Sequence, residues 1–169
     1  INFGLIYGIS SYGLSKQLKV DNGSAKDYID KYFLRYKGIK EFMDKLKVEA
    51  KKNGYVSTTL GRRIYVPNIT HNNFQIRSAA ERTAINAPIQ GTAADILKIA
   101  MINIDKWIHD SDCPAQMIMQ VHDELVFEVE DTFVNEASLK INELMASCYK
   151  LAVPLIVDVG IGNNWDKAH

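Results

Sequence analysis

Apolar side chains recur at intervals of three and four positions through much of the first half of the chain, a pattern typical of amphipathic helices. The pattern predicts helices over residues 2–18 with a break at 8–10, from Ser24 onward, over 37–53, over 73–86, and again from Gly91. Gly54 after Asn53 is a strong helix stop, and Pro88 is expected to end the helix over 73–86.

Short β-strands are predicted at two places. Apolar or β-branched runs flank Leu60-Gly61-Arg62-Arg63, which predicts a hairpin over residues 55–66. Two further runs, Met117-Ile118-Met119 and Leu125-Val126-Phe127, flank Val121-His122-Asp123-Glu124 and predict a second hairpin with its acidic residues at the tip.

The rest of the second half completes an α+β pattern. Residues 134–151 place apolar side chains at helical spacing, residues 155–159 are predicted as a closing strand, and residues 160–169 as a loop. The chain is therefore predicted to be α+β, with a mainly helical first piece followed by a ββαβ piece of an antiparallel sheet. The boundary between the two pieces is expected between Pro67 and Gly91.

Asp123 and Glu124 are the first candidates for chemistry. Adjacent carboxylates repel and raise each other's pKa unless a cation lies between them. Their hard oxygen ligands suit Mg²⁺, which retains water and also binds substrate phosphates. The alternative is a solvated turn, because turns favour Asp and tolerate Glu. His122 alone is a better structural hydrogen-bonding residue than a metal ligand, since no His/Cys set is nearby.

Composition limits the class of protein. The 169 residues suffice for one domain with a core or for two small lobes. No apolar run reaches membrane-spanning length and no secretory signal is evident, so no membrane partner is expected. Cys113 and Cys148 lie far apart and are predicted to be free thiols in a reducing compartment, which favours a cytoplasmic location. The start at Ile1, without an initiator Met, suggests an excerpt of a longer protein.

Net charge is zero, but the charges are unevenly distributed. From Arg35 to Arg63 there are nine Lys/Arg against three Asp/Glu, and from Trp107 to Leu139 there are eight Asp/Glu and no Lys/Arg. A basic and an acidic segment in one chain are compatible with a phosphate-contacting surface beside a metal site. Two solvated helix faces of opposite sign are the alternative.

Aromatic residues near the start suggest a stacking surface. Phe3 and Tyr7 are four residues apart on one helical face, beside Gly4 and Gly8, which leave the rings uncovered. Uncovered rings suit stacking against a base or sugar. A core aromatic pair packed against another helix is the alternative.

A polar set follows within the small-residue stretch 77–95. Arg82, Asn86 and Gln90 are spaced by four and present a guanidinium and two amides on one face. Such donors suit sugar and base-edge contacts in a minor groove, where acceptors are similar across base pairs. A polar stripe on an exposed helix is the alternative.

Five segments together resemble A-family DNA polymerases, in the right order and over the whole chain. Asn2-Phe3-Gly4-Leu5-Ile6-Tyr7-Gly8 is similar to the end of motif B, and Gln120-Val121-His122-Asp123-Glu124-Leu125-Val126 is similar to motif C. The others are Thr59-Leu60-Gly61-Arg62-Arg63, the stretch from Glu81-Arg82 to Gln90-Gly91-Thr92-Ala93-Ala94-Asp95, and Asn163-Asn164-Trp165-Asp166.

The resemblance implies a DNA-directed DNA polymerase, a nucleotidyltransferase of replication and repair. Its partners would be primer–template DNA and dNTP, with no oligomer required, and its reaction would be two-metal attack of a primer 3′-hydroxyl on the α-phosphate. Asp123 would be a catalytic metal ligand with Glu124 its less essential neighbour. Phe3 would face the nucleotide sugar and Tyr7 the templating base, and the DNA contacts would come from Arg77, Arg82, Asn86, Gln90 and His122.

The resemblance also implies an incomplete enzyme. Residues 1–75 would belong to the fingers and 76–169 to the palm. The aspartate of motif A and the basic residues that hold the triphosphate would lie upstream of Ile1, so one ligand set for Mg²⁺ would be missing and the chain alone inactive. A DNA-binding module without catalysis, with Arg35–Arg63 as its footprint, is the alternative. A metal-dependent nuclease would need more carboxylates near Asp123.

Overall fold

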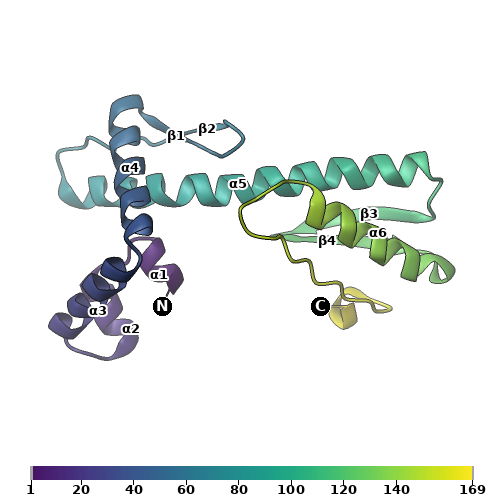
Figure 1. Cartoon of the computed structure of the whole chain (residues 1–169), viewed down its shortest axis with the longest axis horizontal. Helices are drawn as coiled ribbons and strands as arrows, with labels where there is room; N and C mark the ends of the chain where they lie inside the picture. Colours follow the sequence, from purple (N-terminus) through teal and green to yellow (C-terminus); the bar gives the residue numbers. More distant parts are fainter. Residues whose placement is uncertain (1, 169) are drawn as a thin grey trace. The chain divides into compact units, whose positions relative to one another are not determined.

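The computed structural model describes residues 2–168, and Ile1 and His169 lie outside the described residues. Its helices are α1 (Asn2–Ile6), α2 (Ser11–Leu18), α3 (Asn22–Arg35), α4 (Lys37–Asn53), α5 (Phe74–Asp110), α6 (Val134–Ser147) and α7 (Trp165–Ala168), with a 3₁₀ turn at Asp131–Phe133 (Figure 1). The strands β1 (Tyr55–Ser57) and β2 (Arg63–Tyr65) form one antiparallel pair, and β3 (Ala115–Val121) and β4 (Glu124–Val129) form another. The predicted α+β class is confirmed.

The chain packs as two units, Ile1–Thr92 and Ala93–His169. The division falls within α5. The division into fingers (1–75) and palm (76–169) comes from the family resemblance and not from packing, and it stays a prediction.

Helices α1 to α3 share one small core in the first unit. Leu5, Leu14 and Ala25 are buried there, with Ile9, Leu18, Ile29 and Tyr32 packed around them. The predicted break after α1 is confirmed: Gly8 takes a positive φ of 77°, which glycine adopts without strain, and Ser10 caps α2. The cap is a hydrogen bond from the Gly13 backbone N–H to the Ser10 Oγ, at 3.1 Å.

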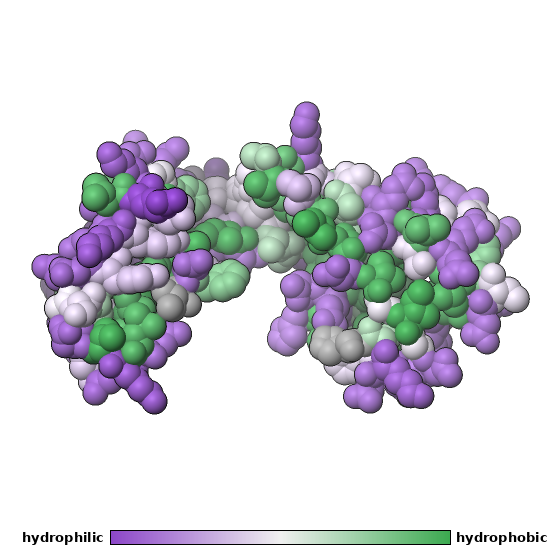
Figure 2. All heavy atoms as spheres, turned by 60° about the horizontal axis from the view of Figure 1, so that its bottom comes forward, coloured by the Kyte–Doolittle hydropathy of each residue, from purple (hydrophilic) through white to green (hydrophobic). Residues whose placement is uncertain are grey.

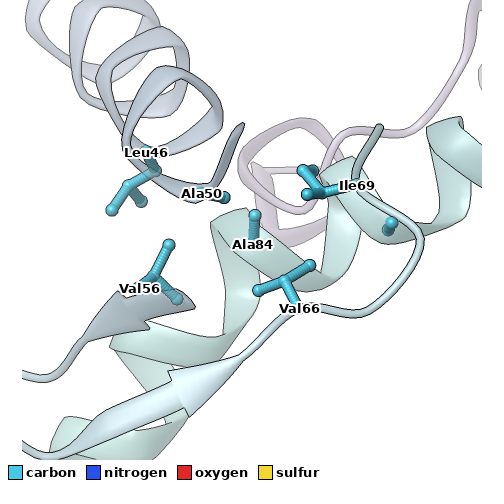
Figure 3. Packing of buried hydrophobic residues seen from close by; sticks show 7 residues of the cluster. Leu46, Ala50, Val56, Val66, Ile69 and Ala84 are labelled. Atoms are coloured by element: carbon cyan, nitrogen blue, oxygen red, sulfur yellow. The ribbon is translucent and has the colours of Figure 1, made fainter. Parts of the chain in front are cut away.

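A second core joins α4, the first hairpin and α5. Buried side chains from these elements and from the segment between the hairpin and α5 point toward one another (Figure 3): Leu46, Ala50, Val56, Val66, Ile69 and Ala84. Ala80 of α5 belongs to the same cluster. The predicted helix over 37–53 is confirmed, and Gly54 ends it in the left-handed conformation with φ 79°. On the outer side of the hairpin Tyr55 pairs with Tyr65, with ring centroids 5.8 Å apart.

The prediction that Pro88 separates two helices is wrong. Helix α5 continues through Pro88 from Phe74 to Asp110. Proline removes one helical hydrogen bond and crowds the preceding turn, at a cost of about 3 kcal/mol in an isolated helix. Here Ala80 and Ala84 are buried against the hairpin before the proline, and Gly91 is buried after it. Tertiary packing on both sides therefore outweighs the local preference.

Gly91 allows the hairpin to approach α5 closely. A Cβ atom at Gly91 would lie 2.7 Å from Ile64 Cδ1 and 2.8 Å from Thr58 Cγ2. We therefore expect Gly91→Val to lower the free energy of unfolding by about 1–3 kcal/mol, the usual result of overpacking. Denaturant unfolding of the chain measures this. Gly38→Val is the matched control, because a Cβ atom at Gly38 in α4 would meet no atom of residues 2–168 within 4 Å other than its own stretch of helix. Equal effects of the two substitutions would contradict the packing argument.

The second unit forms its core between α5, the β3–β4 sheet and α6. Ile104, Ala137 and Ile141 are buried, and the partly buried side chains around them include Trp107, Met117, Leu125 and Phe127. The apolar positions of the predicted helix over 134–151 thus face the sheet, although α6 ends at Ser147.

Two predictions for the C-terminal part are wrong. Residues 155–159 form no strand, because no other strand in residues 2–168 pairs with them, and an unpaired strand leaves its backbone groups unsatisfied. A hydrogen bond attaches this segment to α6: the Asn142 Nδ2 donates to the carbonyl of Val157 at 2.8 Å. The predicted loop over 160–169 contains the short helix α7, and its last residue lies outside the described residues.

The surface carries apolar areas as well as charge. Large exposed hydrophobic side chains include Leu34, Leu139 and Ile156, and Figure 2 shows green hydrophobic areas between purple hydrophilic ones. Contiguous areas of this kind are typical of surfaces that contact other protein or a ligand. Within residues 2–168, no helix combines the length and apolar character needed to cross a membrane.

Both cysteines are free thiols, as predicted. Burial, with a smaller contribution from the charge of Glu136, raises the pKa of the Cys113 thiol above its usual value. Burial likewise raises the pKa of the Cys148 thiol. Both side chains are therefore protonated and poorly nucleophilic at neutral pH.

Candidate functional site

The tip of the β3–β4 hairpin carries the two adjacent acids. Val121 and Glu124 form the last strand pair, and His122 and Asp123 make the two-residue turn between them. His122 has a positive φ of 53°, as tight hairpin turns require. The Gln120 Nε2 donates to the carbonyl of His122 at 3.1 Å, which helps to hold the turn closed. The predicted hairpin with acids at its tip is confirmed.

The strand pattern explains why the hairpin has this register. Met117, Leu125 and Phe127 lie on the face that packs against α5 and α6. A one-residue slip of one strand would place Met117 on the opposite face from Leu125 and Phe127, so burial of all three selects the register. The pairing register shifts between Met117 and Met119, and irregularities of this kind redirect side chains near the ends of sheets. The core of the second unit thus sets where Asp123 projects.

The carboxylates have the chemistry of a Mg²⁺ site. Asp123 is exposed and, within residues 2–168, makes no hydrogen bond or ion pair, while Glu124 is half-buried at the start of β4. The acidic segment around them has no Lys or Arg from Trp107 to Leu139. No group of three His, Cys, Asp or Glu side chains placed to bind a metal occurs in the described part of the chain. The pair therefore fits one side of a Mg²⁺ site that phosphate oxygens and water would extend.

The aromatic pair lies at the other end of the sequence. Phe3 is on α1 and 76% exposed, and Tyr7 follows the helix and is half-buried. Their ring centroids are 6.3 Å apart and the planes are tilted by 35°. Phe3 is not a core residue in this chain, so the alternative of a buried aromatic pair does not describe it. Its exposed ring is available for stacking.

Arg82 lies beside the end of α1. A Cβ atom on Gly8 would be 3.4 Å from Arg82 Cγ, so the glycine permits the close approach of the two segments. The guanidinium is exposed, and its Nη1 donates to Ser78 Oγ at 3.2 Å. The structure therefore brings Tyr7–Gly8 and Arg82 together, which sequence spacing did not indicate.

Asn86 and Gln90 follow Arg82 on the same side of α5, as predicted. Gln90 is exposed. The Oδ1 of Asn86 is buried and has no hydrogen-bond partner among the described residues. A buried amide oxygen without a donor costs about 1–3 kcal/mol, so Asn86 is a polar group that the local structure does not satisfy.

Arg77 has a local structural role. Its Nη1 donates to the carbonyls of His71 and Asn72, at 2.8 and 3.3 Å, and its guanidinium lies over the Phe74 ring at 5.8 Å. These contacts tie the start of α5 to the preceding turn. They leave its predicted DNA contact untested.

The predicted site residues divide between the two units. Phe3, Tyr7, Arg77, Arg82, Asn86 and Gln90 belong to the first unit, and His122, Asp123 and Glu124 belong to the second. Two contacts of the first hairpin with α5 were not predicted from the sequence. Thr59 contacts Thr92, and Arg62 contacts Gly91. No short-range pattern joins residues 33 positions apart, so only the tertiary structure reveals them.

The chain is similar to known proteins over nearly its whole length. Residues 1–167 match the family model of DNA polymerase family A. The chain is 51% identical over 169 residues to DNA polymerase I of Pseudomonas aeruginosa, which covers 100% of this chain and 18% of that protein. It is 45% identical over 168 residues to DNA polymerase I of Mycobacterium bovis, covering 99% of this chain and 19% of the relative.

A solved structure is similar throughout the chain. It is described as the POL domain of Pol1 from M. smegmatis in complex with DNA primer-template and dNTP, with a TM-score of 0.94 and 47% sequence identity. The match covers 99% of this chain and 30% of that chain. The chain thus spans less than a fifth of the length of the two curated relatives, at 18% and 19%.

Proposed function

This chain belongs to DNA polymerase family A, and we propose that it forms part of the polymerase domain of a template-directed DNA polymerase that acts on primer–template DNA and dNTP. Support comes from relatives named DNA polymerase I and from the similar structure, which is described as a complex with primer-template and dNTP. The observation that carries the proposal is the exposed Asp123 carboxylate, without a partner in residues 2–168, at the tip of a hairpin beside Glu124.

The proposed reaction transfers dNMP to the primer. The primer 3′-hydroxyl loses its proton to solvent water as its oxygen forms a bond to the α-phosphorus, the bond from that phosphorus to the bridging oxygen breaks, and pyrophosphate leaves. Mg²⁺ held by Asp123 and Glu124 would stabilise the negative charge that develops on the phosphoryl oxygens. The chain's own contribution would be positional: the hairpin turn, which a hydrogen bond from Gln120 to the carbonyl of His122 helps to close, places the two carboxylates side by side before the reaction begins.

Other residues would position the substrates. Phe3 would face the sugar of the incoming nucleotide and Tyr7 the templating base. The polar residues Arg77, Arg82, Asn86, Gln90 and His122 would contact the primer–template. In this proposal residues 1–75 are part of the fingers, residues 76–169 are part of the palm, and the enzyme acts in the cytoplasm.

A hybrid polymerase tests the proposed function. In it, this chain replaces the matching segment of the Pseudomonas aeruginosa DNA polymerase I, which is 51% identical. We expect the hybrid to extend a primer on a template with Mg²⁺ and dNTP. The control is the unaltered relative, with thermal unfolding showing that both proteins are folded. A folded hybrid that binds primer–template but adds no nucleotide would contradict the proposal.

The ring of Phe3 leads to a prediction about substrate selection. A phenyl group has no hydrogen-bonding atom near the nucleotide 3′ position, so a dideoxynucleotide loses the 3′-hydroxyl without replacement. We expect Phe3→Tyr in the hybrid to improve dideoxynucleotide use by about one to two decades, since a charge-assisted hydrogen bond contributes about 1.5–3 kcal/mol. The ratio of kcat/KM for dNTP and ddNTP measures this. An unchanged ratio would show that Phe3 does not face the sugar.

A further inference from the structure

Pro88 places a weak point in α5 between two of the predicted DNA-contacting residues. Proline has no N–H, so the carbonyl of Ala84 loses its helical donor, and helices bend readily at such positions. Asn86 lies just before the proline and Gln90 just after it. The position of the Gln90 side chain relative to Asn86 therefore depends on the contacts that keep α5 from bending at Pro88.

The first hairpin holds α5 after the proline through hydrogen bonds. The backbone N–H of Thr59 donates to Thr92 Oγ1 at 3.0 Å, and the two threonine hydroxyl oxygens are 2.8 Å apart. The Nη2 of Arg62 donates to the carbonyl of Gly91 at 2.9 Å. These contacts join one short loop to two consecutive residues of the helix.

The same hairpin holds α5 before the proline through apolar packing. Val56 and Val66, which flank the loop, are buried in one core with Ala80 and Ala84 of α5. Helix and hairpin therefore touch on both sides of Pro88, by different kinds of interaction.

The loop is itself rigid. The Thr58 N–H donates to the carbonyl of Arg62 at 2.9 Å, the Gly61 N–H donates to the carbonyl of Thr58 at 2.9 Å, and the Arg62 N–H donates to Thr58 Oγ1 at 3.1 Å. Gly61 takes φ 85°, which closes the turn, and Thr58 is only 5% exposed. The missing side chain of Gly91 lets this loop lie directly on the helix.

The loop leaves the predicted DNA-contacting side of α5 uncovered. Gly91 is nine positions after Arg82, which is roughly half a turn around the helix axis at 3.6 residues per turn. Arg82 and Gln90 are both exposed on their side. The hairpin thus restrains the helix from the opposite side without blocking those side chains.

We infer that the loop Thr58–Arg62 is a brace that fixes α5 across Pro88 and thereby positions Gln90 relative to Asn86 and Arg82. The inference rests on the proposed function, in which these three residues contact the primer–template. Thr59 and Arg62 of the loop, with Thr92 as their partner on α5, act in this proposal as positioning residues, since they hold the helix in place.

Thr92→Val is the test, because it removes the hydroxyl and keeps the shape. In the 169-residue chain we expect faster hydrogen exchange of the backbone amides directly after Pro88, with unchanged exchange in α6. Thr92→Ser keeps the hydroxyl and should retain the exchange rates of the unaltered chain. Thr83→Val is the matched control, because within residues 2–168 the one hydrogen bond of its hydroxyl stays inside α5, to the carbonyl of Ala79 at 3.2 Å. Equal rates for Thr92→Val and the unaltered chain would overturn the brace.

A double-mutant cycle in the hybrid polymerase links the brace to DNA. We expect Gln90→Ala and Thr92→Val each to reduce kcat/KM for primer–template about tenfold, while together they cost little more than either one, because both remove the same positioned contact. Thr83→Val should leave the effect of Gln90→Ala unchanged. If Gln90→Ala has no effect, the proposed DNA contact fails. If Gln90→Ala has its effect and Thr92→Val adds to it in full, the brace fails and the DNA contact stands.

Discussion

Asp123→Asn in the hybrid polymerase is expected to lower kcat/KM for nucleotide incorporation by about two to three orders of magnitude while the protein stays folded. A carboxylate brings a full negative charge to the cation, and an amide of the same shape does not. Removing one preorganised electrostatic group from a site of this kind typically costs about 3–4 kcal/mol, and each 1.36 kcal/mol is a factor of ten. Single-turnover incorporation with saturating dNTP and Mg²⁺ measures the effect.

Two further substitutions make this result specific. Glu124→Gln should have a smaller effect, because Glu124 is half-buried at the start of β4 and Asp123 stands exposed at the tip. Asp112→Asn should have almost none. Asp112 is also an exposed turn residue in the same acidic segment, but it lies before β3 and not at the hairpin tip. Near-normal turnover with Asp123→Asn, or a larger loss with Glu124→Gln, would contradict the assigned roles.

The second large effect concerns the chain by itself: we expect the isolated 169-residue chain to add no nucleotide to a primer. In the proposed function Asp123 and Glu124 would hold only one side of a Mg²⁺ site, and residues 2–168 contain no group of three metal-binding side chains. The two-metal reaction needs ligands on more than one side of the reacting phosphate. Raising the Mg²⁺ or dNTP concentration supplies no further ligand, so neither should restore activity.

Single-nucleotide incorporation with excess Mg²⁺ and dNTP measures this, with the hybrid polymerase assayed in parallel as the positive control. Incorporation by the isolated chain that disappears with Asp123→Asn would overturn the prediction and show that the chain carries a complete site. Incorporation that persists in that variant would come from a contaminating enzyme. The paired assay therefore separates the two outcomes.

Local pattern was sufficient for most elements. The spacing of apolar residues, the break at residues 8–10 and the stop at Gly54 predict α1, α2 and α4, because these signals act within one or two helical turns. The β3–β4 hairpin follows in the same way from two apolar runs around a polar break. Asp123 and Glu124 were therefore placed correctly at its tip from sequence alone.

Local pattern failed where distant contacts compete with it. Pro88 is a helix breaker by its own chemistry, yet α5 passes through it because Ala84 and Gly91 are packed against the hairpin. Residues 155–159 have the composition of a strand, but a strand forms only with a partner, and the described residues offer none.

The sequence by itself determined the class of the fold, the family resemblance and the identity of the acidic pair, since all three depend on residue types at short, regular spacing. Only the tertiary structure decided which residues meet. It placed Gly8 against Arg82, left Phe3 exposed, and joined Thr59 to Thr92 across 33 positions. The physical reason is that short-range preferences amount to about 1 kcal/mol per residue, whereas contacts between distant segments depend on burial and shape that arise once the chain has folded.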